Sequence, residues 1–259
     1  MGTKVLLEKK GKVCVIRMNL PETLNSLTPE LRVDLKTALM EFRNDKTIHV
    51  AVLTGSGRAF CAGGDLAEME DGFTAVYGVE HMTGCNEITL MIAEIPKPII
   101  ACVNGVAAGA GFSITMACDL VYASTGASFM QAFAKVGLIP DMGSLYLLPR
   151  VVGMHKAKEL IWTARKVSAE EAKAIGIVNE LYKPEELEAK VLEFAGSLAD
   201  GPVFALGLGK RFLAKSLESS LRDMLDNEAL GQAICLQSED NKEGVQAFYE
   251  KRKAVFQGK

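Results

Sequence analysis

Short apolar runs alternate with helical patterns along the first two thirds of the chain, and this alternation limits the fold most. The runs predict buried strands at residues 49–54, 99–103 and 119–123, because strands covered on both faces read as continuous apolar stretches. Thr28 is a typical helix cap and Pro29 suits the first helical position. The leucine spacing after them predicts a helix to about residue 44. Strands separated by helices are typical of parallel sheets. We therefore expect an α/β fold, preceded by a hairpin of residues 5–8 and 13–18.

The last third of the chain shows a mainly helical pattern. Ser168 and Glu171 form a capping-box pattern for a helix that ends at Gly176, and a strand is predicted over residues 177–181. Four further helices are predicted at residues 184–198, 202–215, 219–235 and 239–256. We divide the chain into a core, residues 1–200, and a C-terminal helical region, residues 201–259.

Composition excludes several function classes. The chain has 259 residues, with 29 Lys and Arg against 32 Asp and Glu, so no overall positive field attracts nucleic acid or an anionic membrane. No secretory pattern or long apolar span occurs, and the six cysteines are scattered. We expect a cytoplasmic protein with reduced thiols, no nucleic-acid or membrane partner, and no metal site.

Stock catalytic motifs are incomplete. The glycines from Gly109 to Gly111 begin a dinucleotide fingerprint, but Ile114 stands where its third glycine belongs. No P-loop, nucleophile elbow or paired zinc-ligand pattern is found. Only three histidines occur, and none lies in a glycine-flanked turn. Conventional nucleotide, metal and serine-nucleophile chemistry is therefore not indicated.

Two glycine-rich loops remain, residues 60–66 (FCAGGDL) and 104–111 (NGVAAGAG). Each follows a predicted buried strand and leads into a helix. Small residues there expose backbone N–H groups and let a ligand approach the main chain. Two converging amides would form an oxyanion hole, although tight strand–helix packing alone also favours small residues.

These motifs, with PKPIIACVNGVAAGAG at 96–111, ACDLVYA at 117–123, GLIP at 137–140 and LPRVVG at 148–153, resemble the crotonase superfamily of enoyl-CoA hydratases and isomerases. The resemblance extends from about residue 4 to residue 256. It implies a spiral of β-β-α units with a C-terminal helical trimerisation region. It also implies an acyl-CoA thioester substrate, no separate cofactor, and a homotrimer or a dimer of trimers.

The resemblance also implies the site. The oxyanion-hole amides fall on Gly64 and Ala110, and Ala110 replaces the family's usual glycine. Residues 68–84 correspond to a pocket-lining segment, and their composition suggests mobility. The remaining substrate-binding positions, the last two from a neighbouring subunit, are Leu24, Ala62, Gly63, Asp65, Leu66, Gly109, Ser113, Phe133, Phe248 and Lys251.

The two glutamates that family hydratases use for water addition are missing. Ser113 and Phe133 occupy their positions, and phenylalanine neither takes nor gives a proton. Asp141, after Ile139 and Pro140, supplies a carboxyl group in an apolar, glycine-flanked loop where burial would raise its pKa. An acid here resembles that of dienoyl-CoA isomerases, chlorobenzoyl-CoA dehalogenases and, most closely, phenylacetate-pathway epoxide–oxepin isomerases.

We therefore expect an enoyl-CoA or ring-epoxide acyl-CoA isomerase with Asp141 as its acid/base. Three alternatives stay open. The first is a hydratase that does not use two glutamates. The second is a hydrolase or dehalogenase with Asp141 as nucleophile, for which His81 lies in a comparable region to the family's dehalogenase histidine. The third is a non-catalytic acyl-CoA-binding or RNA-binding homologue.

Overall fold

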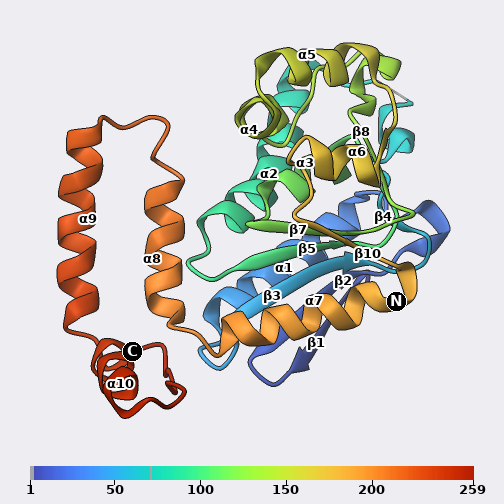
Figure 1. The fold of residues 1–259 in the computed structure, drawn as a ribbon. Coiled ribbons are helices and arrows are strands. Elements are labelled where there is room, and N and C mark those ends of the chain that lie inside the picture. The colour runs from blue at the N-terminus through green and yellow to red at the C-terminus, as the bar shows by residue number, and fades with distance from the viewer. Residues whose placement is uncertain (1–2, 71) are drawn as a thin grey trace.

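The computed structural model describes residues 3–70 and 72–259 (Figure 1). Within these residues the larger sheet has six strands in the order β1-β2-β3-β5-β7-β10. Its strands are Val5–Lys10, Val13–Met18, Val50–Gly55, Ile99–Val103, Leu120–Ser124 and Glu180–Tyr182. The β1–β2 pair is antiparallel and every other pair is parallel. The predicted hairpin and parallel sheet are confirmed.

A second sheet of four short strands runs in the order β4-β6-β8-β9 in the described chain. These strands are Ala59–Cys61, Val106–Ala108, Ser128–Met130 and Val167–Ser168. The first two strands lie in segments that were expected to be loops, because three-residue strands carry too little periodicity to be recognised. Strands β3, β5 and β7 are each followed by a short strand and then by a helix, which gives the expected β-β-α spiral.

Ten α-helices complete the described chain. They are α1 (Pro29–Asn44), α2 (Ala75–Glu94), α3 (Ala110–Ala117), α4 (Ser144–Val152), α5 (Met154–Thr163), α6 (Ala169–Ala174), α7 (Pro184–Ala199), α8 (Val203–Leu213), α9 (Leu221–Leu236) and α10 (Glu239–Glu250). One-turn 3-10 helices lie at Pro21–Thr23, Leu66–Met69 and Ala132–Val136. A longer helix after Asp65 was expected. Asp65 does cap a helix, but only this single 3-10 turn.

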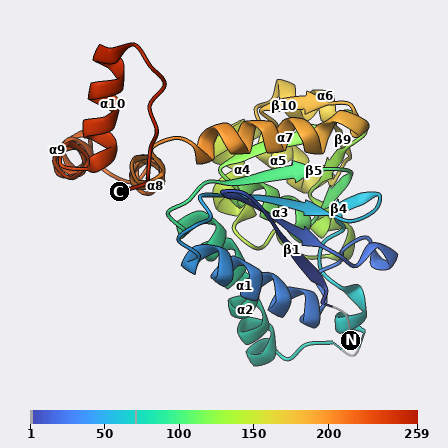
Figure 2. The ribbon, with the colours of Figure 1, turned by 90° about the horizontal axis from the view of Figure 1, so that it is seen from below.

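The larger sheet is covered on both faces, which is why its strands are apolar throughout. Val13 and Val15 of β2 pack with α7, whereas Cys14 and Ile16 belong to the main core with α1, α2 and α3. Figure 2 shows α7 on one side of the sheet and α1 and α2 on the other. The alternation of side chains along a strand divides the core into these two layers.

Helices α8–α10 extend away from the sheets (Figures 1 and 2), and we refer to residues 201–259 as the arm. The arm begins in the turn between α7 and α8, where the sequence placed its division. Lys210 of α8 ties it to the core: its Nζ donates to the carbonyl of Ile92 and lies 2.9 Å from the Asp119 carboxylate.

Two predicted elements have wrong boundaries. Helix α10 ends at Glu250 rather than residue 256, because Lys251 is left-handed and Arg252 turns back to pair with Glu243. The strand predicted at 177–181 is residues 180–182, because the amides of Ile177 and Val178 still bond to the end of α6.

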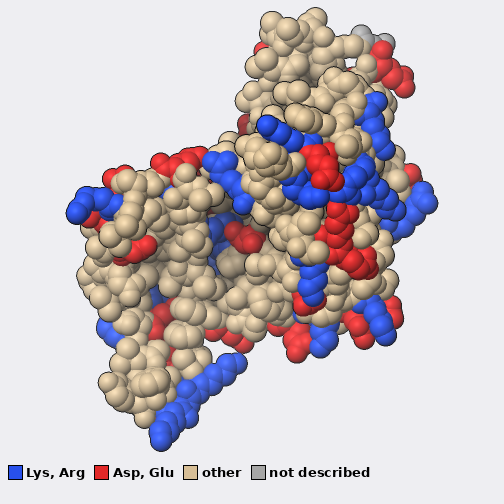
Figure 3. Space-filling model, turned by 45° about the horizontal axis from the view of Figure 1, so that its top comes forward, with Lys and Arg blue, Asp and Glu red and all other residues tan. Residues whose placement is uncertain are grey.

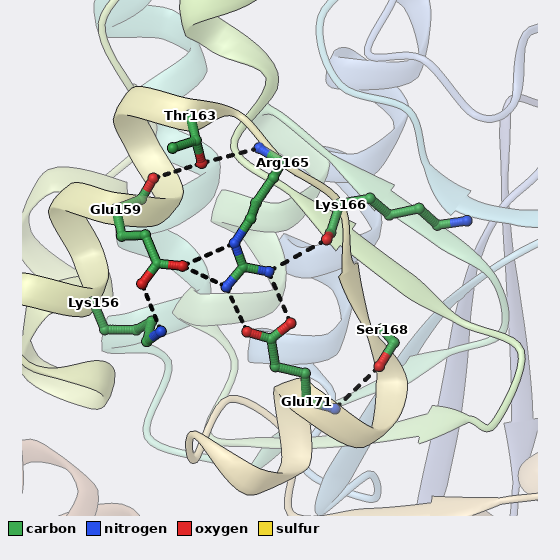
Figure 4. A network of polar contacts seen from close by, with 7 residues as sticks. All are labelled: Lys156, Glu159, Thr163, Arg165, Lys166, Ser168 and Glu171. Carbon is green, nitrogen blue, oxygen red and sulfur yellow. Dashed lines mark hydrogen bonds and ion pairs between the residues drawn. The ribbon is translucent and has the colours of Figure 1, made fainter.

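The capping box predicted at Ser168 is half formed. Ser168 Oγ accepts from the Glu171 amide, but the Glu171 carboxylate pairs instead with Arg165, which also binds Glu159 (Figure 4). Arg165 thereby joins the end of α5 to the start of α6. The guanidinium offers a planar set of donors that suits two carboxylates. In a complete capping box, the Glu171 carboxylate would instead accept from the Ser168 amide.

Surface charge follows the near balance of the composition. Lysine, arginine, aspartate and glutamate side chains are interspersed on the face in Figure 3. In the described part of the chain, no single helix is both long and apolar enough to cross a membrane. By length and composition, α7 and α8 meet that test only when they are taken together, and the two helices are bent by 101° at the break between them.

Candidate active site

The two glycine-rich loops leave neighbouring strands of the smaller sheet. Strand β4 pairs in parallel with β6, and Cys61 lies opposite Ala107. Parallel strands end at the same edge of a sheet, so residues 62–65 and 109–110 emerge side by side. The topology therefore brings together two loops that are more than 40 residues apart in the sequence.

Glycine is required where these loops touch. Gly63 has a φ of +109°, and a Cβ there would lie 2.9 Å from the Ala108 carbonyl oxygen. A Cβ on Gly111 would lie 2.2 Å from the carbonyl oxygen of Cys61. Any side chain at either position would push the loops apart. The two glycines thus set the spacing of the adjacent backbone amides.

Gly64 and Ala110 both border one cavity of about 670 Å³. Their backbone amides are the oxyanion-hole candidates. Neither donates a hydrogen bond to another described residue. Ala110 is the first residue of α3, where a helix has no internal acceptor for its N–H groups and its dipole favours negative charge. Its helical conformation has a negative φ, so alanine replaces glycine without strain. The arrangement suits stabilisation of an oxyanion.

Asp141 borders the same cavity. Burial raises the pKa of this carboxyl group from 3.8 to about 6. Its Oδ1 atom is buried, and no described residue hydrogen-bonds it. An unpaired buried carboxyl oxygen with a pKa near neutrality is suited to accept and return a proton.

The loop that carries Asp141 is anchored at both ends. Met142 and Gly143 have positive φ values of 47° and 87°. Thr89 Oγ1 of α2 donates to the Met142 carbonyl at 3.0 Å, and the Ser144 amide bonds to the Asp141 carbonyl. These bonds tie the backbone beside Asp141 to α2 and to the first residue of α4.

A second group of polar side chains borders the cavity, and sequence reasoning did not identify it as a group. Arg32 forms two hydrogen bonds with Glu68, at 2.7 and 2.9 Å. His81 Nδ1 lies 3.9 Å from Glu68, and its Nε2 lies 3.7 Å from Cys85 Sγ. Burial, and secondarily the Arg32 charge, lowers the pKa of His81. Only His81 was considered beforehand, for one alternative, since nothing in sequence spacing links α1, the Leu66–Met69 turn and α2.

Several residues assigned to substrate binding lie around the oxyanion loops. Asp65 borders the cavity, and Leu66 beside it is 58% exposed. Leu24 has a φ of +57°, and its carbonyl accepts from the Ala62 amide at 3.0 Å. Leu24 thus supports the first loop through its backbone. A role for these residues with CoA stays a prediction.

Other assigned residues do not border the cavity. Ser113 is fully buried, and its hydroxyl bonds back to the Gly109 carbonyl at 3.3 Å. Phe133 is buried, and its ring would lie 3.8 Å from a Cβ on Gly109. Both therefore pack behind the turn that presents Ala110.

Phe248 and Lys251 lie on the arm and are exposed. Neither residue borders the cavity just described. Phe248 instead lines a groove within the arm. Within one chain they are thus separate from Asp141. A contact with the substrate of a neighbouring subunit stays a prediction.

The fold is that of a crotonase-like scaffold. The family model described as Enoyl-CoA hydratase/isomerase matches residues 8–259. This chain therefore belongs to the enoyl-CoA hydratase/isomerase family. It is an acyl-CoA enzyme of that family, as the sequence resemblance implied.

Individual relatives carry different activities in their names. The chain is 39% identical over 254 residues to 1,2-epoxyphenylacetyl-CoA isomerase of Escherichia coli, with 97% of each chain covered. It is 34% identical to crotonyl-CoA hydratase of Syntrophomonas wolfei, again with 97% of each covered. Among solved structures, an enoyl-CoA hydratase from Bacillus anthracis matches with a TM-score of 0.94 and 32% identity, covering 99% of this chain and 100% of that one.

Proposed function

We propose that this protein is an acyl-CoA isomerase that moves a carbon–carbon double bond from the β,γ to the α,β position. The amides of Gly64 and Ala110 hold the thioester oxygen, which gains negative charge as the dienolate forms. Asp141 removes the proton on the α-carbon and returns it to the γ-carbon. The proton is conserved, so the reaction needs neither water nor a separate cofactor.

The observation that carries this proposal is the Asp141 carboxyl group itself. It is buried in the same cavity as the two free amides, its Oδ1 has no protein partner among the described residues, and its pKa is raised to about 6. A carboxylate with such a pKa is a stronger base than an ordinary aspartate and still largely ionised at neutral pH. One such group is enough for a double-bond shift.

A hydratase is the first competitor, because hydration needs two proton-handling groups and two further carboxylates, Asp65 and Glu68, border the cavity. Glu68 is engaged by both terminal nitrogens of Arg32, and Asp65 accepts from the Ala67 amide as the cap of its 3-10 turn. Ser113 and Phe133 occupy the positions of the family's hydratase glutamates, and both are buried and do not border the cavity. These features favour isomerisation over water addition.

A hydrolase or dehalogenase is the second competitor, and one observation supports it. His81 borders the same cavity as Asp141, where it could activate water against an aspartyl ester. Such an ester would be detected as a mass increase on Asp141 after incubation with an aryl-CoA. A ring-epoxide substrate, as in the name of the Escherichia coli relative, remains compatible with the same isomerase machinery.

The deciding experiment compares wild-type protein with Asp141→Asn on a β,γ-enoyl-CoA and on crotonyl-CoA. We expect isomerisation by wild type, a loss of at least about 100-fold in the variant, and slow hydration by both. An Asn variant as active as wild type would exclude the proton-transfer role. Hydration faster than isomerisation would establish a hydratase instead.

We also propose that the arm mediates self-association into a trimer. It exposes large apolar side chains that a monomer would leave in water. They include Phe204, Leu213, Leu217, Leu221, Leu225, Leu230, Ile234, Phe248 and Tyr249. Sedimentation analysis of the full chain tests the stoichiometry.

A further inference from the structure

His81 and Glu68 face each other across a gap that neither closes. His81 Nδ1 and Glu68 Oε2 are 3.9 Å apart, beyond hydrogen-bond distance. Both residues border the cavity that Asp141 also borders. Their side chains are only 11% and 17% exposed. Poorly hydrated polar groups normally pair with each other or with a ligand.

Glu68 is held in place and still has acceptor capacity. Arg32 donates once to each carboxylate oxygen, and its guanidinium is itself fixed by the Leu27 carbonyl at 2.7 Å. A carboxylate oxygen accepts more than one hydrogen bond. The Oε2 atom therefore presents a free lone pair beside His81.

His81 is equally fixed, and its neighbours define its tautomer. Its ring packs against Phe73 with centroids 5.0 Å apart, and Nε2 lies 3.7 Å from Cys85 Sγ. Burial raises the pKa of Cys85 and lowers that of His81, so the thiol keeps its proton and the imidazole is neutral. We assign the tautomer in which the thiol donates weakly to Nε2 and the ring proton sits on Nδ1, 3.9 Å from Glu68 Oε2.

We propose that His81 and Glu68 bind a hydroxyl group carried by the acyl chain of the substrate. A hydroxyl oxygen accepts from His81 Nδ1–H and donates its own proton to Glu68 Oε2. It thereby satisfies one donor and one acceptor at once. A keto or ether oxygen can only accept, and a hydrocarbon chain leaves both groups unpaired.

This inference rests on the proposed acyl-CoA site, and it names the substrate class as hydroxylated acyl thioesters. The test measures binding of saturated thioesters, which cannot isomerise. Calorimetry gives the Kd of hexanoyl-CoA, of its derivatives with a hydroxyl on each of the last three carbons, and of their methyl ethers. The proteins are wild type, His81→Phe, which keeps the ring packing, and Glu87→Gln.

Glu87 is the matched control, because it lies on the same helix, pairs with Lys36 and is outside the cavity. In wild type and Glu87→Gln, at least one hydroxyl derivative should bind about tenfold more tightly than hexanoyl-CoA and its own ether. His81→Phe should lose that preference.

Two results would overturn the inference: no hydroxyl derivative is preferred by wild type, or His81→Phe retains the preference. A hydroxyl preference that His81→Phe loses, in a protein that isomerises no enoyl-CoA, would support the hydroxyl site while refuting the isomerase. Isomerisation with no hydroxyl preference would support the isomerase and refute the hydroxyl site. The two proposals thus fail separately.

Discussion

The Thr89 hydroxyl on α2 donates to the carbonyl of Met142 at 3.0 Å, and this bond fixes the turn that presents Asp141. Thr89 lies outside the group of residues that border the cavity. It therefore acts on Asp141 only through the backbone. Kinetic measurements distinguish such a positioning role from substrate binding, because it changes kcat and leaves KM nearly constant.

Replacing Thr89 by valine should remove that bond with little change in volume. We expect a loss of about 1 kcal/mol in unfolding free energy and a several-fold fall in kcat for the proposed isomerisation, with KM nearly constant. Thr83→Val is the matched control, because Thr83 bonds only to the Val79 carbonyl of its own helix. Equal kcat values for the two variants would contradict the positioning role.

The activity of the proposed isomerase should depend on the ionisation of Asp141. Its pKa is raised by burial to about 6, and only the ionised form accepts a proton. We therefore expect kcat/KM to be constant at neutral pH and to fall about tenfold per pH unit below the pKa. A profile that stays flat down to about pH 4, the ordinary range of an aspartate, would refute this assignment.

The same burial should cost stability. The folded protein binds the Asp141 proton more tightly than the unfolded chain, whose aspartate has a pKa of 3.8. Stability is therefore lost as pH rises from about 4 to about 6 and stays reduced above that range. Asp141→Asn should be more stable than wild type at pH 8, by up to roughly 3 kcal/mol.

Urea unfolding of both proteins at several pH values measures this effect. The stability difference should shrink as pH falls, because wild-type Asp141 becomes neutral like asparagine. A variant less stable than wild type at pH 8 would mean that Asp141 has a stabilising partner in the folded protein.

The contact between the two oxyanion loops predicts the effect of adding a methyl group. Gly63→Ala would place Cβ 2.9 Å from the Ala108 carbonyl oxygen in a backbone conformation with a φ of +109°. We expect a destabilisation of about 2 kcal/mol and a loss of isomerisation of at least about 100-fold. Gly11→Ala is the comparison, since Gly11 also has a positive φ but nothing lies within 4 Å of a Cβ there.

Thermal melting and isomerase assays of both variants test this prediction. Gly11→Ala should show only the conformational cost and keep full activity. A Gly63→Ala protein with wild-type activity would show that the spacing of the loops does not matter.

The sequence by itself determined the parallel sheet, the helix that begins at Thr28, and the two loops with Gly64 and Ala110. These features depend on local patterns: apolar runs, capping residues and glycine positions act on their immediate neighbours. Asp141 was singled out through the family resemblance, because an acid at this position resembles that of the family's isomerases and dehalogenases. The short strands of the smaller sheet escaped detection because their pairing is entirely non-local.

Tertiary structure alone decided what stands opposite Asp141. Arg32, Glu68, His81 and Cys85 come from α1, a 3-10 turn and α2, and they meet only because the β-β-α spiral stacks those elements around one cavity. Likewise, Ser113 turns its hydroxyl to the Gly109 carbonyl, which no spacing rule foretells. Side-chain direction and desolvation depend on packing between distant segments, so the chemistry of the cavity emerges only once the chain is folded.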